Sequence, residues 1–275
     1  EELGVEKRAG YYESAGVLRD MFQNHMLQLL ALAAMEPPAS FSSERVRDER
    51  VKVLRAIRPL PLDDIDSHLV LGQYGEGEVS GERVCGYREE EGVDPKSNTP
   101  TFAAMKLYVD NWRWNGVPFY LRSGKRLARR VSEVAIQFKR VPHMMFKGAI
   151  DEEIGANVLV LRIQPDERVQ LFFHTKSPGS KLCLRNVLMD FSYSEGYTGL
   201  ILEAYERVLL DALTGEDMLF LRSDGVERAW SLLTPVIEAI EGASPPPLHI
   251  YRSGMWGPKE ADSLIAKQSD RWRND

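Results

Sequence analysis

Apolar residues recur at helical spacing in the first part of the chain. The pattern predicts a long helix from Tyr12 to Met35, which Pro37 and Pro38 end. A second and more polar helix is expected from about Ser43, with a serine cap at its start and an end before Pro59. The apolar positions of the first helix, three or four residues apart, are Val17, Leu18, Met21, Phe22, Met26, Leu29, Leu30 and Ala33.

From Thr101 onward the pattern changes to alternating apolar and polar residues. Six such stretches, separated by turn residues and preceded by an isolated candidate at 68–74, predict strands at 102–110, 117–124, 133–141, 157–165, 168–176 and 181–193. Helices return at 204–213 and 224–241, and three prolines at 245–247 stop the last one. Alternation with a period of two is typical of an antiparallel sheet with one covered face. We therefore predict an α+β domain over residues 1–275, with a large, mostly antiparallel sheet and helices packed on one face.

Composition narrows the class of protein. The 275 residues are 43% apolar and 28% charged, as expected of a soluble globular domain. The sequence has no apolar run of the ~18 residues that a membrane helix needs, and its start has no secretion signal. A net charge of −6 disfavours a general nucleic-acid binder, whose affinity depends on phosphate contacts. We expect neither a nucleic-acid partner nor a membrane partner.

The spacing of cysteines and histidines gives no sign of a metal site. Cys85 and Cys183 lie far apart and belong to no CxxC motif, so neither a disulfide framework nor a zinc site is expected. The five histidines form no HxxxH or HExxH pattern. These features are typical of a protein from the reducing cytoplasm.

The first predicted helix carries Asp20, Gln23, Asn24 and His25 in its early turns, although the rest of it is strongly apolar. On a helical wheel of about 100° per residue, Asp20 lies about 140° from His25, so we expect no direct pair but a shared ligand across the helix. A histidine can accept a proton from an alcohol at neutral pH, and an ionised aspartate can accept hydrogen bonds from sugar hydroxyls. The alternative is that His25 is an ordinary core histidine with satisfied ring nitrogens.

Basic residues gather directly after the predicted strand at 117–124. The stretch 122–130, RSGKRLARR, holds five cations in nine residues, among them Lys125 and Arg130. Loops at strand ends commonly form sites, and lysine together with arginine suits a phosphate monoester. The alternative is a solvated basic loop. At the end of another strand Gln164 precedes a proline, which turn chemistry explains without any function.

No motif for a nucleotide cofactor is present. Neither GxGxxG nor GxxxxGK[ST] opens a strand-to-helix turn anywhere in the sequence. A dinucleotide used with this chain would therefore have to be bound by another segment.

Several stretches together resemble glucose-6-phosphate dehydrogenase. The most specific are RDMFQNHMLQ at 19–28 and FYLRSGK at 119–125. They are accompanied, in the order and spacing of that family, by EELGVEKRAGYYESAGVL at the start and GPKEAD near the end. The resemblance covers nearly the whole chain, is weakest at 60–95 and 141–155, and is closest to the shorter, bacterial form of the enzyme.

The resemblance implies a reaction and a site. His25 is expected to be the general base that takes the proton from the C1 hydroxyl of glucose 6-phosphate while hydride leaves C1 for NADP. A homodimer or tetramer, formed through the sheet, is also implied. The residues expected to bind the substrate are Glu1, Asp20, Lys125, Arg130 and Gln164.

The amino-terminal Rossmann domain of that family is absent from this sequence. NADP is therefore expected to be bound mainly by the missing domain, and the 275 residues alone are expected to be inactive. A second hypothesis is a non-catalytic oligomerisation module whose sheet joins subunits. The presence of His25, Asp20, Lys125 and Arg130 together favours the enzyme, since a decayed site has no reason to keep all four.

Overall fold

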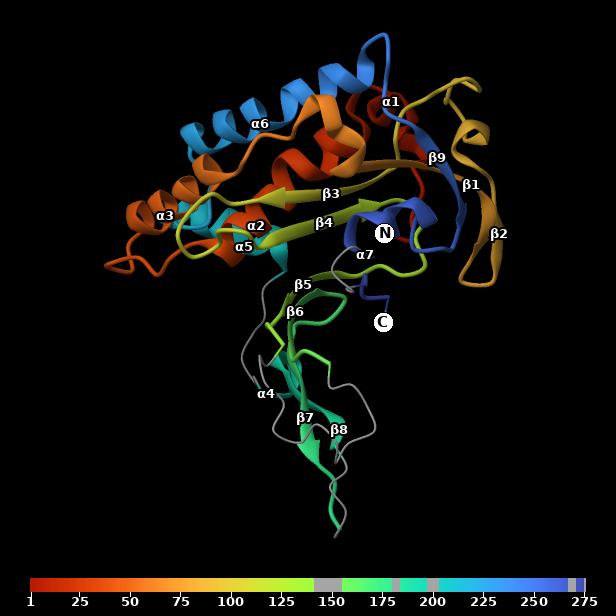
Figure 1. The fold of residues 1–275 in the computed structure, drawn as a ribbon. Coiled ribbons are helices and arrows are strands. Elements are labelled where there is room, and N and C mark those ends of the chain that lie inside the picture. Colours follow the sequence, from red (N-terminus) through yellow and green to blue (C-terminus); the bar gives the residue numbers. More distant parts are fainter. Residues whose placement is uncertain (141–154, 180–183, 197–202, 267–270, 275) are drawn as a thin grey trace. The chain divides into compact units, whose positions relative to one another are not determined.

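The computed structural model describes residues 1–140, 155–179, 184–196, 203–266 and 271–274. The chain divides into two compact units, Glu1–Arg129 with Ala204–Asp275, and Arg130–Glu203 (Figure 1). The larger unit holds most of the helices, and each unit has a sheet of its own. Within the described part of the chain, no helix combines the length and the apolar character needed to cross a bilayer.

The sheet of the larger unit is mostly antiparallel. Its strands lie in the order β2-β1-β3-β4, and β9 pairs with β1 in the parallel direction. The register between β3 and β4 sets Phe102 opposite Gly124, so the residue after Gly124 leaves the sheet beside the start of β3. These strands are β1 Leu69–Val79, β2 Glu82–Val84, β3 Phe102–Tyr108, β4 Pro118–Gly124 and β9 Leu248–Ser253.

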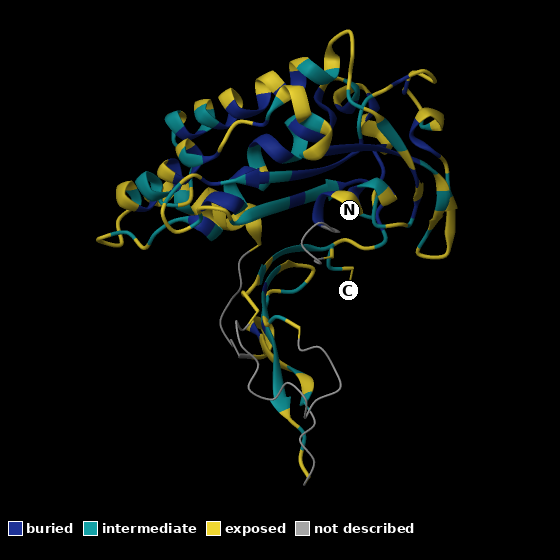
Figure 2. Ribbon diagram, in the orientation of Figure 1, coloured by how far each residue is buried: buried dark blue, intermediate teal, exposed yellow. Residues whose placement is uncertain are grey.

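Helices cover one face of this sheet, as the sequence predicted. Ala103, Met105 and Leu107 of β3 pack against the apolar sides of α2, α3 and α6, and Figure 2 shows the dark blue of buried residues along β3. The alternate residues of β3, Phe102 and Ala104, belong to a second core on the other face. The helices of this unit are α1 Ala9–Val17, the π-helix Leu18–Met26, α2 Leu27–Ala34, α3 Ser43–Ala56, α5 Ala204–Thr214, α6 Ser223–Glu241 and α7 Asp262–Ala266, with short 3₁₀ turns at Glu6–Arg8, Leu62–Ser67, Tyr87–Glu89 and Lys259–Ala261.

The long helix predicted from Tyr12 to Met35 is not one regular helix. Gly16 has φ +58° and ψ 176°, a conformation that only glycine adopts readily, and it breaks the helix near the end of α1. The π-helix follows, and the Leu27 N–H donates to Phe22 O, five residues back. The prediction of continuous α-helix was therefore wrong over this stretch. The predicted helix from Ser43 is confirmed by α3, but the expected serine cap is not formed, because Ser42 at the N-cap position makes no side-chain capping hydrogen bond.

The smaller unit is an antiparallel sheet whose strands follow one another in chain order, β5-β6-β7-β8. The α+β class, with mostly antiparallel strands, is confirmed, and the described strands divide between two sheets because irregular chain at 125–131 follows β4. Residue 141 and residues 181–183, at the ends of two predicted strands, lie outside the described residues. The elements are β5 Ser132–Gln137, β6 Val158–Gln164, β7 Arg168–Lys176, β8 Leu184–Ser192 and α4 Tyr193–Gly196.

Candidate active site

Lys125, the first residue after β4, is the centre of a compact group of charges. Its side chain is only 8% exposed. The ammonium nitrogen Nζ forms an ion pair with the carboxylate of Glu1 and lies 3.9 Å from Oδ2 of Asp20. The structure therefore brings together three of the residues that the sequence predicted for one site.

The backbone of Lys125 is fixed on both sides by buried groups. Its N–H donates to the carbonyl oxygen of Thr101 at 3.0 Å. The Tyr251 hydroxyl donates to the carbonyl oxygen of Lys125 at 2.6 Å, and Tyr251 itself is fully inside the core. Burial raises the pKa of Tyr251, so its hydroxyl stays protonated and remains a donor. The point from which the lysine side chain extends is therefore well defined.

Glu1 reaches Lys125 because the first residues run alongside the end of β4. The Glu1 nitrogen donates to Gly124 O at 2.9 Å, and the N–H of Leu127 donates to Glu1 O at 2.7 Å. Between these two bonds Arg126 has φ +50°, an uncommon conformation for a residue other than glycine. Its N–H donates to Leu3 O at 3.1 Å, which helps to hold that turn.

Asp20 is nearly buried and has several partners. Its side chain is 12% exposed. The Tyr11 hydroxyl donates to Oδ1 at 3.1 Å, and a guanidinium nitrogen of Arg8 lies 3.8 Å from the same oxygen. Partial burial and then the charge of Asp20 raise the pKa of Tyr11, which keeps that hydroxyl a donor. Sequence reasoning missed Tyr11 and Arg8, because the break in the helix before Asp20 places α1 where regular helical spacing does not predict it.

His25 lies in the same π-helix as Asp20, five residues further on. The hydrogen bonds of a π-helix join residues five apart, so each turn holds more residues than an α-helical turn and Asp20 and His25 lie closer to one face. The expected separation of about 140° assumed α-helical geometry and does not apply here. His25 is exposed, and in the described part of the chain its imidazole makes no hydrogen bond, which does not support the alternative of a satisfied core histidine.

Arg130 and Gln164 belong to the smaller unit, and both are exposed. The Ser132 hydroxyl donates to Oε1 of Gln164 at 3.4 Å, across the pair of strands β5 and β6. The part of these two residues in a site with Lys125 stays a prediction.

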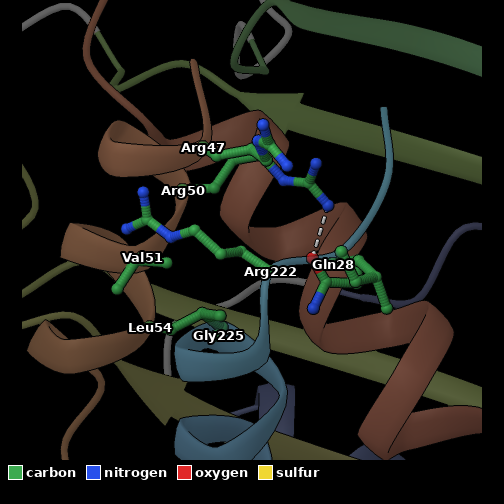
Figure 3. A pocket seen from close by; sticks show the side chains of 8 residues that line it. Gln28, Arg47, Arg50, Val51, Leu54, Arg222 and Gly225 are labelled. Carbon is green, nitrogen blue, oxygen red and sulfur yellow. Dashed lines mark hydrogen bonds between the residues drawn. The ribbon is translucent and has the colours of Figure 1, made fainter. Parts of the chain in front are cut away.

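A second group of cations lines a small pocket between α2, α3 and the start of α6 (Figure 3). Arg47 and Arg222 are both paired with aspartates. Arg50 is 5% exposed and donates to Oε1 of Gln28 at 2.7 Å, the bond drawn in Figure 3. Because carboxylates already engage two of the three arginines, this cluster joins the helices together and is not a second candidate site for an anion.

The described residues offer no obvious place for a cofactor. They contain no group of three or more His, Cys, Asp or Glu side chains able to hold a metal ion. The described strands also do not lead into a helix through a glycine-rich GxGxxG turn, which would hold the pyrophosphate of a dinucleotide. The described residues therefore do not contain the glycine-rich cradle of a dinucleotide site.

Comparisons with known proteins agree on one family. The family model described as glucose-6-phosphate dehydrogenase, C-terminal domain, matches residues 1–273. Glucose-6-phosphate 1-dehydrogenase of Aggregatibacter actinomycetemcomitans is 48% identical over 274 residues, which are 99% of this chain and 54% of that protein. The enzyme of Treponema pallidum is 48% identical over 276 residues, which are 100% of this chain and 53% of that protein.

A solved structure described as glucose-6-phosphate dehydrogenase in complex with its substrate glucose-6-phosphate is similar with a TM-score of 0.89 and 39% identity. The match covers 100% of this chain and 55% of that one. The chain thus spans about half the length of the curated relatives it matches. On the family model and on these relatives, the chain belongs to the glucose-6-phosphate dehydrogenase C-terminal domain family.

Proposed function

We propose that this chain is the substrate-binding part of an enzyme that oxidises D-glucose 6-phosphate to 6-phosphoglucono-1,5-lactone, with NADP as the hydride acceptor. The reaction would be the first step of the pentose phosphate pathway in the cytoplasm. The observation that carries the proposal is the convergence of Lys125, Glu1 and Asp20, which come from three separate segments. A buried cation beside two carboxylates suits a ligand that is an anion at one end and a polyol at the other.

Each residue then has a stated part in the reaction. The imidazole of His25 accepts the proton of the C1 hydroxyl, a step to which a positioned base contributes typically ~10²–10⁴-fold. The carboxylates of Asp20 and Glu1 accept hydrogen bonds from sugar hydroxyls. Lys125 and Arg130 provide positive charge for the phosphate, and Gln164 is a further contact.

A sugar phosphate that binds here must fit among the ion pairs that Lys125 already makes. An ammonium group has three N–H donors, and two carboxylates lie near that of Lys125. Among the described residues one of these donors binds Glu1, so a phosphate that enters can accept another, while the sugar hydroxyls bind the carboxylates. Exchange of partners within one buried group avoids leaving any charge unpaired, which would be costly.

We assign NADP mainly to an amino-terminal Rossmann domain, as the resemblance implies, because the described residues contain no glycine-rich turn of that kind. The 275-residue chain alone is therefore expected to be inactive, and a homodimer or tetramer is expected to form through the sheet. The alternative of a non-catalytic oligomerisation module gives no reason for the buried charges around Lys125.

Replacement of the proposed base tests the function. In the full-length protein, His25→Asn removes the proton acceptor from an exposed position and should lower kcat by roughly 10²–10⁴-fold, with circular dichroism and oligomeric state retained. His68→Asn is the matched control, because among the described residues the only hydrogen bond of the His68 ring is to the backbone oxygen of Asp64. Activity of H25N close to that of H68N would contradict the proposal.

A further inference from the structure

Tyr12, which the proposed function does not use, lies against the ammonium group of Lys125. The centre of its ring is 5.6 Å from Lys125 Nζ, within the distance at which a cation is attracted to an aromatic face. The Tyr12 side chain is 2% exposed, and its ring packs edge-on to Tyr87 at 6.2 Å between centroids. A ring held so firmly gives the lysine a fixed surface to rest on.

The hydroxyl of Tyr12 does not explain why a tyrosine is found at this position. It is buried and has no hydrogen-bond partner among the described residues, which costs free energy. Burial, first of all, raises the pKa of Tyr12 well above its ordinary value, so the hydroxyl is neutral and offers the lysine no ionic partner. What Tyr12 contributes to its surroundings is therefore the ring.

Unlike the two carboxylates, the Tyr12 ring does not occupy the N–H donors of the Lys125 ammonium. The attraction of an ammonium to an aromatic face is electrostatic and persists whichever groups the N–H donors bind. Glu1 and Asp20, in contrast, are expected to turn to sugar hydroxyls when the substrate enters. A lysine side chain held only by those two carboxylates would then regain rotamer freedom, which lysine has in large measure.

We propose that Tyr12 is a positioning residue whose ring holds the Lys125 ammonium at the phosphate end of the site while Glu1 and Asp20 exchange partners. This inference rests on the proposed function. It assigns Tyr12 no contact with the substrate, and its effect reaches the substrate only through Lys125. Because the ring holds the lysine in place, less ordering is left to occur on binding.

The test changes the electrons of the ring and leaves its size almost unaltered. In the full-length enzyme, Tyr12→Phe is the reference, and phenylalanines with increasing numbers of ring fluorines then replace it, since fluorine withdraws electrons from the face. The KM for glucose 6-phosphate should rise stepwise, by roughly 2- to 30-fold over the series, while the KM for NADP stays level. The same series at Phe119, a partly buried ring packed on Trp114 with no cation over it among the described residues, should leave both constants level.

The results separate a failure of the role of Tyr12 from a failure of the proposed function. A KM for glucose 6-phosphate that ignores fluorination at position 12, or that rises together with the KM for NADP, overturns the inference. The dependence on fluorination must also disappear in a Lys125→Ala background, because the ring then has no cation to hold. If Lys125→Ala alone leaves the KM for glucose 6-phosphate unchanged, the proposed function loses its phosphate cation, a failure distinct from that of Tyr12.

Discussion

Burial and charge oppose each other at Lys125. An ammonium group removed from water is destabilised by several kcal/mol unless it is paired. Two carboxylates and one aromatic face surround it here, and its backbone is held by Thr101 and Tyr251. The site is therefore ordered before a ligand arrives, which lowers the cost of binding.

On the proposed function, Lys125→Ala should weaken binding of the sugar phosphate selectively. A hydrogen bond to a charged group contributes about 1.5–3 kcal/mol, so the KM for glucose 6-phosphate should rise roughly 10- to 150-fold, with little change in the KM for NADP. Steady-state kinetics of the full-length enzyme measure both constants. Lys52→Ala is the control, because Lys52 is an exposed lysine of α3. An equal rise in both constants would count against a role in binding the sugar phosphate.

For single residues, the sequence predicted which side chains belong to the site better than it predicted how they are arranged. Residue type and resemblance singled out Asp20, His25 and Lys125, and the structure brings Asp20 next to Lys125. The link between Glu1 and Lys125 depends on backbone pairing across more than a hundred residues, which no local pattern predicts. Tyr12 was missed because an aromatic residue in an apolar helix is ordinarily only core packing.

Among the elements, the cluster in Figure 3 joins α2, α3 and α6 through a buried arginine. Arg50 donates to Gln28 of α2, and among the described residues this neutral amide is its one hydrogen-bond partner. Burial, and then the nearby charge of Arg47, lower the pKa of Arg50. Gln28 therefore has a larger effect on stability than an ordinary glutamine on a helix.

Gln28→Leu should leave a buried guanidinium without its acceptor. The expected loss is about 1–3 kcal/mol in the free energy of unfolding, measured by denaturant titration monitored by circular dichroism. Gln28→Glu is the matched variant, because it keeps an acceptor at the same position and adds a charge that pairs with Arg50. If Q28L were as stable as Q28E, the bond between Gln28 and Arg50 would contribute little.

The pattern of apolar residues predicted most elements, and its failures have physical causes. Both ends of strand β7 were predicted correctly, at residues 168 and 176. This strand lies between two antiparallel neighbours, β6 and β8, and its sequence pattern extends over its whole length. Strand β9 was missed, because it follows three prolines and pairs in parallel with β1, which is remote in sequence. The break at Gly16 was missed because a single glycine inside an apolar helix does not by itself indicate a left-handed conformation.

Over the larger unit as a whole, four buried tyrosines link segments that are distant in the sequence. Tyr12 and Tyr87 are in contact, Tyr74 packs on Tyr87, and Tyr251 lies in the same core. Burial is the leading cause that raises the pKa of each of the four above the ordinary tyrosine value of 10.0. This core is therefore compatible only with neutral tyrosines.

The raised pKa values predict how the stability depends on pH. In the unfolded chain these tyrosines lose their protons near pH 10, whereas in the folded chain they hold them to higher pH. Their contribution is thus fully present below about pH 10 and is lost as the pH rises through the folded-state values. Tyrosinate absorbance of the buried groups and loss of the circular dichroism signal should therefore appear together above pH 10.

Tyr12→Phe tests the effect of tyrosine ionisation on stability without removing a hydrogen bond, because the Tyr12 hydroxyl has no partner among the described residues. The variant removes one titrating group and should make the alkaline fall in the free energy of unfolding shallower, with little loss at neutral pH. Tyr205→Phe is the control, since Tyr205 is 85% exposed and should change neither. Ionisation of all ten tyrosines at an ordinary pH, before any unfolding, would show that the core tolerates the charge.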